Sequence, residues 1–244
     1  MLSEQVRSAF VALAKATHKT DFNALVEVLR KRKIGRILHF THVDNLESIL
    51  SIGIQTKSEV IDSKIKFIET DPRRFDGFLE SISFSIHMPN TFLLAVKNKE
   101  LKNEIVVLEI AANCLLVKPF AAFPSNAAGG IFSDEINQDP YRFVGQRGLE
   151  GIYLNKNLRK EANLHSAEPT DQQSEILFFD TIDTAQILAI HLPKNFPEEK
   201  IKVINSLVKT GLNAWVHESC NCGLFSRWSG VYRKYEIGWE TNGK

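Results

Sequence analysis

Residues 36–54 read RILHFTHVDNLESILSIGI and contain a strand, two polar side chains and a helix. Side chains of a strand alternate between the two faces of a sheet, so His39 and Thr41 are expected to share one face. Asp44 is expected to cap the helix that follows, and Gly53 is expected to end it. An imidazole and a hydroxyl at such a strand end can hydrogen-bond a small polar ligand.

The composition indicates one folded domain. The chain has 244 residues, of which 43% are hydrophobic, enough to bury a sizeable core. We expect a single domain over 1–244, with an N-terminal helical region (1–35), a catalytic core (36–192) and a helical and aromatic C-terminal region (193–244).

The expected location is the cytoplasm, with no membrane association. The longest apolar runs of the chain are FLLAV at 92–96 and IVVLEIAA at 105–112. Both are far shorter than the roughly 20 residues of a membrane span. The N-terminus lacks the unbroken apolar centre of a secretory signal. Three cysteines are too few, and odd in number, for a disulfide framework, which is typical of a reducing compartment.

The net charge of +1 is unevenly distributed, because residues 1–36 carry eight Lys and Arg against three Asp and Glu. Most of the excess lies in RKRKIGR at 30–36. Such a run can bind a phosphate backbone by sequence-independent electrostatics. It can equally be a solvated helix end whose cations complement the helix dipole. The sequence leaves both interpretations open.

Strands are expected mostly in the middle of the chain and helices at its ends, which predicts an α+β fold. SISFSI at 81–86 alternates apolar residues with serines, so its serine face is expected to line a cavity. Irregular segments are expected over 118–148 and 157–173. The other predicted elements are helices at 2–17, 21–33 and 197–210 and strands at 92–96, 104–111, 114–117, 175–179 and 185–192.

Four side chains form a candidate catalytic set. Glu175 opens an apolar strand, where the sheet would hold its carboxylate toward a cleft. A carboxylate suits the positive charge that develops on a sugar during glycosyl transfer. Arg74 lies in the turn-rich loop DPRRFDGF, and an arginine fork suits a pyrophosphate. His39 and Thr41 would complete the set.

These residues resemble the DarT family of toxins, which transfer ADP-ribose from NAD to a base of single-stranded nucleic acid. The resemblance covers roughly residues 36–192 and implies an ADP-ribosyltransferase-like split sheet. It is carried by HFTHVDNLESIL at 39–50, DPRRFDG at 71–77, PSNAAGG at 124–130 and PTDQQSEIL at 169–177.

The resemblance implies a role for each matched residue. Glu175 would be catalytic, and His39 and Thr41 would contact the nicotinamide and its ribose. Arg74 matches the essential arginine, although Arg73 is adjacent and the register can slip by one. Asn126 would lie on the substrate side. Aromatic residues beside basic ones can stack an unpaired base, and the candidates are Phe75, Phe78 and Tyr141.

The resemblance favours single-stranded DNA as acceptor, with thymidine or guanosine as the modified base. It leaves two alternatives: the same chemistry on RNA as a phage-defence toxin, and a non-catalytic NAD- or nucleic-acid-binding module. A toxin of this family implies a cognate antitoxin as protein partner. No metal is expected. His217, Cys220 and Cys222 have neither the usual zinc spacing nor an evident fourth ligand.

Overall fold

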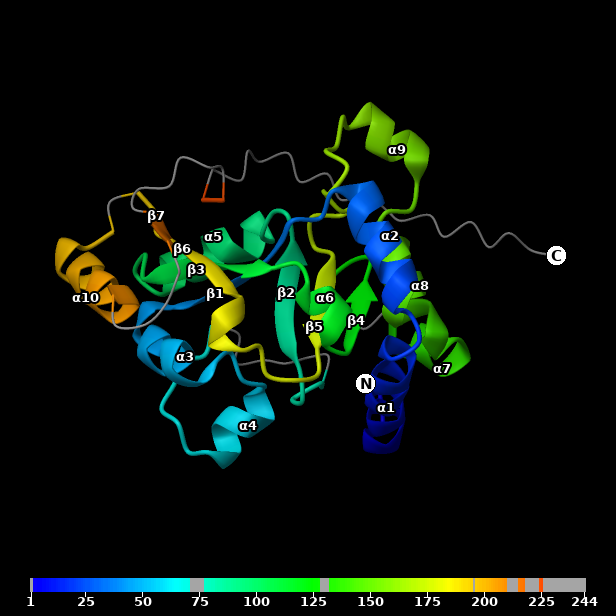
Figure 1. Cartoon of the computed structure of the whole chain (residues 1–244), viewed down its shortest axis with the longest axis horizontal. Helices are drawn as coiled ribbons and strands as arrows, with labels where there is room; N and C mark the ends of the chain where they lie inside the picture. Colours follow the sequence, from blue (N-terminus) through cyan, green and yellow to red (C-terminus); the bar gives the residue numbers. More distant parts are fainter. Residues whose placement is uncertain are drawn as a thin grey trace.

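The structure is a computed structural model, and it describes residues 2–70, 77–127, 132–194, 196–209, 215–217 and 224–225. Within these residues, seven strands form one sheet in the order β4-β5-β2-β1-β3-β6-β7 (Figure 1). All neighbours are antiparallel except β6 and β7. The strands are β1 (Arg36–His42), β2 (Ile82–Ile86), β3 (Ile105–Ala111), β4 (Phe120–Phe123), β5 (Glu175–Phe178), β6 (Ile187–His191) and β7 (Trp215–His217).

Helices surround this sheet. Helices α1 and α8 contact β4, α2 contacts α8, and α10 contacts α3 and β7 (Figure 1). None of the described helices is both long and apolar enough to cross a membrane. The helices are α1 (Glu4–His18), α2 (Phe22–Arg32), η1 (Val43–Asn45), α3 (Leu46–Ile52), α4 (Lys57–Asp62), α5 (Thr91–Glu100), α6 (Cys114–Val117), α7 (Phe132–Gln138), η3 (Pro140–Phe143), α8 (Gly145–Gly151), α9 (Lys156–Glu161), η4 (Thr184–Gln186) and α10 (Glu198–Lys209).

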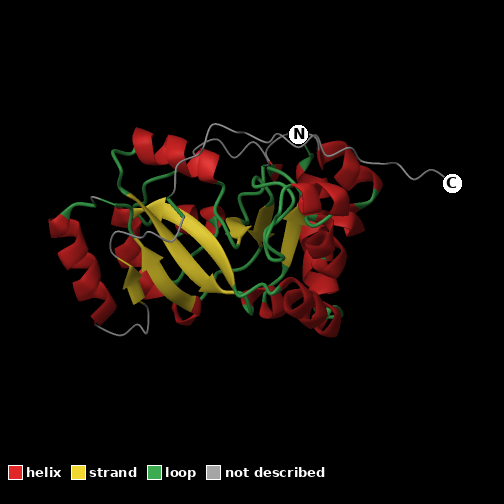
Figure 2. Ribbon diagram, turned by 90° about the horizontal axis from the view of Figure 1, so that it is seen from above, coloured by secondary structure: helices red, strands yellow, loops and turns green. Residues whose placement is uncertain are grey.

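The sheet is split between β1 and β2. These strands pair at only two positions, Ile37 with Ile86 and Leu38 with Ser85, whereas β1 pairs with β3 along its whole length. Figure 2 shows the strands in two groups with loops between them. The predicted α+β class is confirmed, and the split agrees with the predicted architecture.

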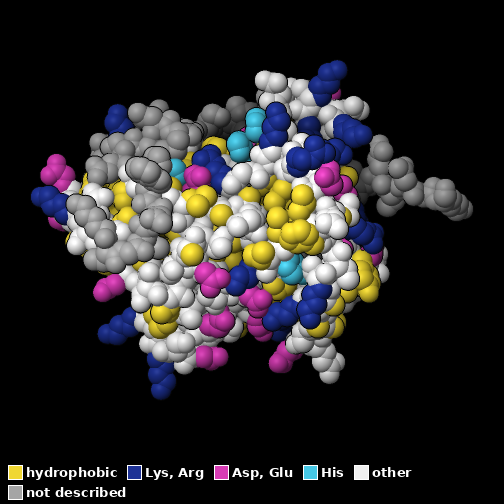
Figure 3. Space-filling view, in the orientation of Figure 1, with side chains coloured by type: hydrophobic (Ala, Val, Ile, Leu, Met, Phe, Trp, Pro, Cys, Tyr) yellow, Lys and Arg dark blue, Asp and Glu magenta, His cyan; other side chains and the backbone are white. Residues whose placement is uncertain are grey.

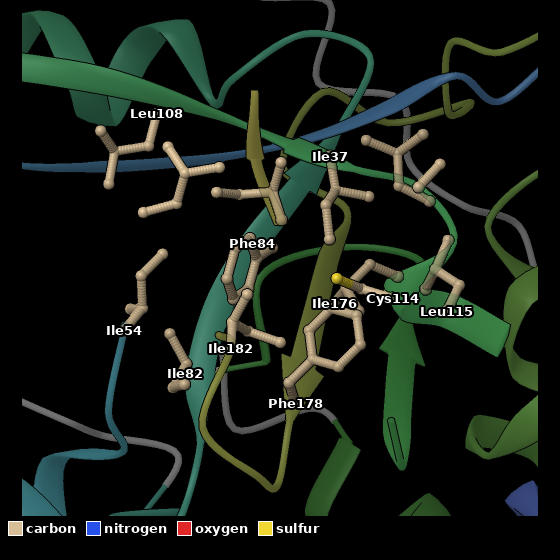
Figure 4. Close-up of a cluster of buried hydrophobic side chains, with 14 of the residues drawn as sticks. Ile37, Ile54, Ile82, Phe84, Leu108, Cys114, Leu115, Ile176, Phe178 and Ile182 are labelled. Atoms are coloured by element: carbon tan, nitrogen blue, oxygen red, sulfur yellow. The ribbon is translucent and has the colours of Figure 1, made fainter. Parts of the chain in front are cut away.

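The hydrophobic core lies on the face of the sheet to which the apolar residues of β2 point. Ile82, Phe84 and Ile86 are buried, while the serines between them are partly exposed. Figure 4 shows Phe84 close to Ile176 and Phe178 of β5, and the two phenylalanine rings meet edge to face with centroids 5.2 Å apart. The apolar face therefore fixes which way the serines of β2 point.

Two short apolar runs predicted as strands are helical, and those predictions were wrong. Residues 92–96 lie in α5, where the side-chain oxygen of Asn90 accepts a hydrogen bond from the Leu93 N–H at 3.1 Å and caps the helix. Residues 114–117 form α6, a single turn after β3. Runs of four or five apolar residues have no periodicity that separates a strand from a buried helical turn.

The predicted irregular segments were also wrong in part. Residues 118–148 contain β4, α7, η3 and the start of α8. In α7 the buried residues Phe132 and Ile136 are spaced four apart, which is helical periodicity over too few residues to be distinctive. The predicted loop 157–173 contains most of α9.

Asp44 does not cap α3, contrary to the prediction. Residues 43–45 form a short 3-10 turn, and the ring Nδ1 of His42 accepts the Asp44 N–H at 3.2 Å. The Asp44 carboxylate instead lies 3.4 Å from Lys200 Nζ. A partner on α10 therefore takes the oxygen that local sequence assigns to the helix end.

Gly53 ends α3 as predicted, and its replacement is expected to destabilise the fold. Its φ is +88°, and a Cβ there would lie 2.4 Å from the carbonyl oxygen of Ile182. We expect Gly53→Ala to lower the free energy of unfolding by about 2 kcal/mol or more, from backbone strain and this clash. Urea denaturation measures the loss. Gly35→Ala is the matched control, because nothing lies within 4 Å of its added Cβ; equal stability of both variants would contradict the prediction.

Candidate active site

A pocket with a cavity volume of about 220 Å³ lies where β1 and β2 separate. Its walls come from both strands, from α3, from the segment 65–70 and from the start of β5. The polar residues in the walls include His39, Thr41, Asn45, Ser83, Asn126, Gln173, Ser174 and Glu175. The split in the sheet therefore creates a concave site whose floor and walls belong to distant parts of the chain.

Glu175 is held at the pocket wall by two donors. One carboxylate oxygen accepts a hydrogen bond from the Ser83 hydroxyl, and the other accepts from the backbone N–H of Ala127 at 3.0 Å. Glu175 is the first residue of β5, so the sheet fixes its backbone as well. The carboxylate thus has a defined position before any ligand binds.

His39 is oriented by the opposite strand of the split. Its Nδ1 lies 2.9 Å from the Ser83 carbonyl oxygen, which can only accept, so Nδ1 carries the hydrogen. In the neutral ring Nε2 then has the lone pair and can accept from a ligand hydroxyl or amide. Ser83 therefore binds His39 through its carbonyl and Glu175 through its hydroxyl, and it links the two sides of the pocket.

Thr41 is oriented by the buried amide of Asn45. The Asn45 Nδ2 donates to Thr41 Oγ1 at 3.0 Å and to the Ile68 carbonyl at 2.9 Å, and its Oδ1 accepts from the Ile68 N–H at 2.8 Å. Since the amide occupies an acceptor position of Thr41, the Thr41 hydroxyl hydrogen points elsewhere. Asn45 also fastens the wall segment 65–70 to the end of β1.

The loop before Glu175 is fixed by its own polar contacts. Asp171 accepts from the Gln173 N–H at 2.8 Å, and the Ser174 hydroxyl donates to the Pro124 carbonyl at 2.9 Å. Burial raises the pKa of Asp171, and the hydrogen bond from Gln173 only partly opposes this. The loop therefore presents Gln173 and Ser174 to the pocket beside Asn126.

A family model described as "ssDNA thymidine ADP-ribosyltransferase, DarT" matches residues 38–216. The match includes every polar residue of the pocket named above and most of the chain. The chain belongs to the DarT family. The predicted family and enzyme class, ADP-ribosyltransferase, are confirmed. No curated protein matches the sequence.

Solved DarT structures resemble the fold at low sequence identity. Thermosipho africanus DarTG in complex with ADP-ribose is 15% identical with a TM-score of 0.48, and the match covers 75% of this chain and 50% of that one. Thermus sp. 2.9 DarT in complex with NAD+ is 15% identical with a TM-score of 0.47, and the match covers 76% of this chain and 96% of that one. The same protein in complex with ADP-ribosylated ssDNA is 14% identical with a TM-score of 0.48, and the match covers 77% of this chain and 95% of that one. The chain thus spans half of the DarTG chain.

The structure brings four of the residues assigned by the DarT resemblance to one pocket. His39, Thr41, Asn126 and Glu175 all line it. Their individual roles remain predictions. Arg73, Arg74 and Phe75 lie outside the described residues, as do Cys220 and Cys222.

The two remaining aromatic candidates do not line the pocket. Phe78 is 2% exposed and packs against Phe10 and Phe179, so its ring is not available to stack a base. This corrects the sequence prediction, in which Phe78 was chosen for its position beside basic residues. Tyr141 is 54% exposed on η3.

Sequence reasoning missed two residues that position this DarT site. Ser83 had a signal, since the alternation in SISFSI already placed its side chain toward a cavity. Asn45 had none, because its partner Ile68 lies 23 residues later in a segment without periodicity.

One ionic cluster offers the donor set of a metal site. His42, Asp44 and Glu104 bring ligand atoms within 4.8 Å of one another. Lys200 Nζ lies 2.8 Å from the Glu104 carboxylate and 3.4 Å from that of Asp44, so an ammonium group already supplies the positive charge. The cluster ties α10 to the end of β1.

Proposed function

We propose that this DarT family member transfers ADP-ribose from NAD to thymidine bases of single-stranded DNA, with Glu175 as the catalytic carboxylate. The observation that carries the assignment is that Glu175, His39 and Thr41 line one pocket inside the matched region. NAD is the co-substrate, and no metal takes part.

In the reaction, the bond between nicotinamide and the ribose anomeric carbon breaks, and nicotinamide leaves with the bonding electrons. A base nitrogen forms the new bond to the same carbon and loses its proton. The positive charge on the sugar in the transition state is stabilised by a fixed negative group. Glu175 supplies that group, and its two hydrogen bonds keep it in place without reorganisation.

The other pocket residues bind the two substrates. His39 accepts from the nicotinamide ribose, and Thr41 donates to a carbonyl or ribose oxygen of the same half of NAD. Arg74, or Arg73 beside it, binds the pyrophosphate. Asn126 faces the acceptor base. That base must be unpaired, because its reacting nitrogen cannot reach the ribose from inside a duplex, and Phe75 and Tyr141 are the candidates to stack it.

The test is incubation of the protein with NAD and thymidine-containing oligonucleotides, followed by mass spectrometry. We expect single-stranded DNA to gain the mass of one ADP-ribose and nicotinamide to be released. A matched RNA oligomer in direct competition tests the RNA alternative. No mass gain on either polymer would overturn the proposal and leave the non-catalytic module as the better explanation.

Removing the Ser83 hydroxyl is expected to slow the transfer step. A hydrogen bond to a charged group contributes about 1.5–3 kcal/mol, so Ser83→Ala should lower kcat roughly 10- to 100-fold with a smaller change in the KM for NAD. Ser83→Thr keeps a hydroxyl and should retain most of the activity. Full activity of Ser83→Ala would show that Glu175 does not depend on this contact.

We also propose that residues 1–244 form one domain that acts as a cytoplasmic toxin with a cognate antitoxin. The packing of α1 on β4 and of α2 on α8, and the pairing of β7 with β6, support the domain assignment. The toxin role and the antitoxin rest on the family resemblance. Growth arrest on expression, relieved by co-expression of a candidate antitoxin, would test them.

A further inference from the structure

Two guanidinium groups lie against one buried tyrosine ring at the junction of α2 and α9. The Arg32 guanidinium carbon is 4.4 Å from the centre of the Tyr153 ring, and that of Arg159 is 5.2 Å away. Tyr153 is 1% exposed. The two like charges contact the same ring and repel each other, which is unfavourable unless an anion lies close by.

The charge of Arg159 is not paired with a carboxylate. Its N–H groups donate to the carbonyl oxygens of Glu168 at 2.6 Å and His165 at 3.0 Å, and more weakly to Ser166. Burial, and then the positive charge of Arg32, lower the pKa of Arg159. Within the described parts of the chain, neither Arg32 nor Arg159 forms an ion pair. The carbonyl oxygens carry only partial negative charges, so they do not neutralise the two guanidinium charges around Tyr153.

Further cations surround this pair, and Figure 3 shows Lys and Arg side chains gathering over α2 and α9. The carboxylates on or beside these helices are Glu161, Glu168 and Glu27, the last of which pairs with Arg30, and they are fewer than the cations. Helix dipoles do not account for the excess, because each helix C-terminus carries only about half a negative charge. We define the basic surface as Lys31, Arg32, Lys33, Lys156 and Lys160; Arg159, which is 8% exposed, adds positive charge next to it.

We propose that this basic surface binds the phosphodiester backbone of the DNA acceptor, at nucleotides that flank the modified base. The inference rests on the proposed function and adds a second contact region to it. Strand β1 begins at Arg36, next to the surface, and reaches Thr41 in the pocket over about 17 Å, a span of a few nucleotides. Helix α2 precedes residue 38, so this contact lies partly outside the family match.

Arg159 gives the surface a connection to the acceptor side of the pocket. Its hydrogen bonds fix residues 165–168, and its NH1 lies 3.4 Å from Thr170 Oγ1. The chain then continues through Gln173 and Ser174 of the pocket wall to Glu175. DNA held on the basic surface would therefore meet the loop that leads to the catalytic carboxylate.

The test compares a triple variant, Lys31→Gln, Arg32→Gln and Lys160→Gln, with a control of equal charge change, Lys99→Gln, Lys194→Gln and Lys202→Gln. The control lysines are exposed and lie on α5, on the loop after β6 and on α10. Anisotropy of a labelled oligonucleotide measures affinity against salt. Each lost phosphate contact lowers the salt slope by about 0.7, so we expect a drop of about 2 for the triple variant and none for the control.

Transfer to two substrates separates this surface from the reaction itself. We expect the triple variant to lose activity on a long oligonucleotide but to modify a thymidine-containing trinucleotide as the unsubstituted protein does. An unchanged salt slope of oligonucleotide binding in the triple variant would overturn the proposal. An acidic protein partner would then be the better candidate to bind this surface. Equal losses on both oligonucleotides would also overturn it. If the unsubstituted protein transfers nothing, the proposed function fails, while the anisotropy still tests the surface.

Discussion

Glu175→Gln is expected to lower the rate of ADP-ribose transfer about 10²- to 10³-fold, in line with removal of a preorganised electrostatic contact. The substitution removes the negative charge that faces the ribose. It also places an amide N–H₂ against one of two donors, the Ser83 hydroxyl or the Ala127 N–H, because a glutamine has only one accepting oxygen. The measurement is single-turnover transfer from NAD to a single-stranded oligonucleotide.

Binding and stability measurements show whether Glu175→Gln acts on the chemistry. Calorimetry should find NAD affinity within a few-fold of the unsubstituted protein, and thermal unfolding should shift by a few degrees at most, since Glu175 is only partly buried. Retained transfer and retained toxicity on expression would exclude Glu175 as the catalytic group.

Asn45→Ala is expected to raise the KM for NAD roughly 10- to 100-fold and to cost about 2–3 kcal/mol of stability. The variant leaves the buried Thr41 hydroxyl without its donor, and an unsatisfied buried group costs about 1–3 kcal/mol. The Ile68 N–H and carbonyl also lose the amide, but water can partly replace it because Ile68 is 36% exposed. The wall segment 65–70 loses its attachment to β1. Steady-state kinetics against NAD concentration and urea denaturation measure the two effects.

Two further variants define what Asn45 does. Asn45→Asp keeps an acceptor for the Ile68 N–H but no donor for Thr41 or the Ile68 carbonyl, so its KM should fall between those of Asn45 and the alanine variant. Asn113→Ala is the control, since Asn113 precedes α6 without a side-chain capping bond. An unchanged KM in Asn45→Ala, with stability alone reduced, would limit Asn45 to a structural role.

Local pattern was enough for the elements whose signals lie close together in sequence. The strand around His39, the glycine end of α3 and the alternation of β2 all followed from neighbouring residues. Pattern failed for 92–96 and 114–117, where a short apolar run fits a strand and a helical turn equally well. For 92–96 the cap from Asn90 marks the helix, and for 114–117 the helical turn buries Cys114 and Leu115.

The sequence by itself determined the α+β class, the DarT family and the residue types of the site, because these depend on short motifs and their order along the chain. Only the tertiary structure decided which neighbouring groups hold the side chains of the site in position. Ser83 reaches Glu175 across 92 positions of sequence, and Asn45 reaches Ile68 across 23. Such contacts arise when strands β1 and β2 separate and distant segments pack around the gap. Local sequence periodicity does not predict contacts between such distant segments. The positions of the side chains in the site are therefore a property of the folded chain.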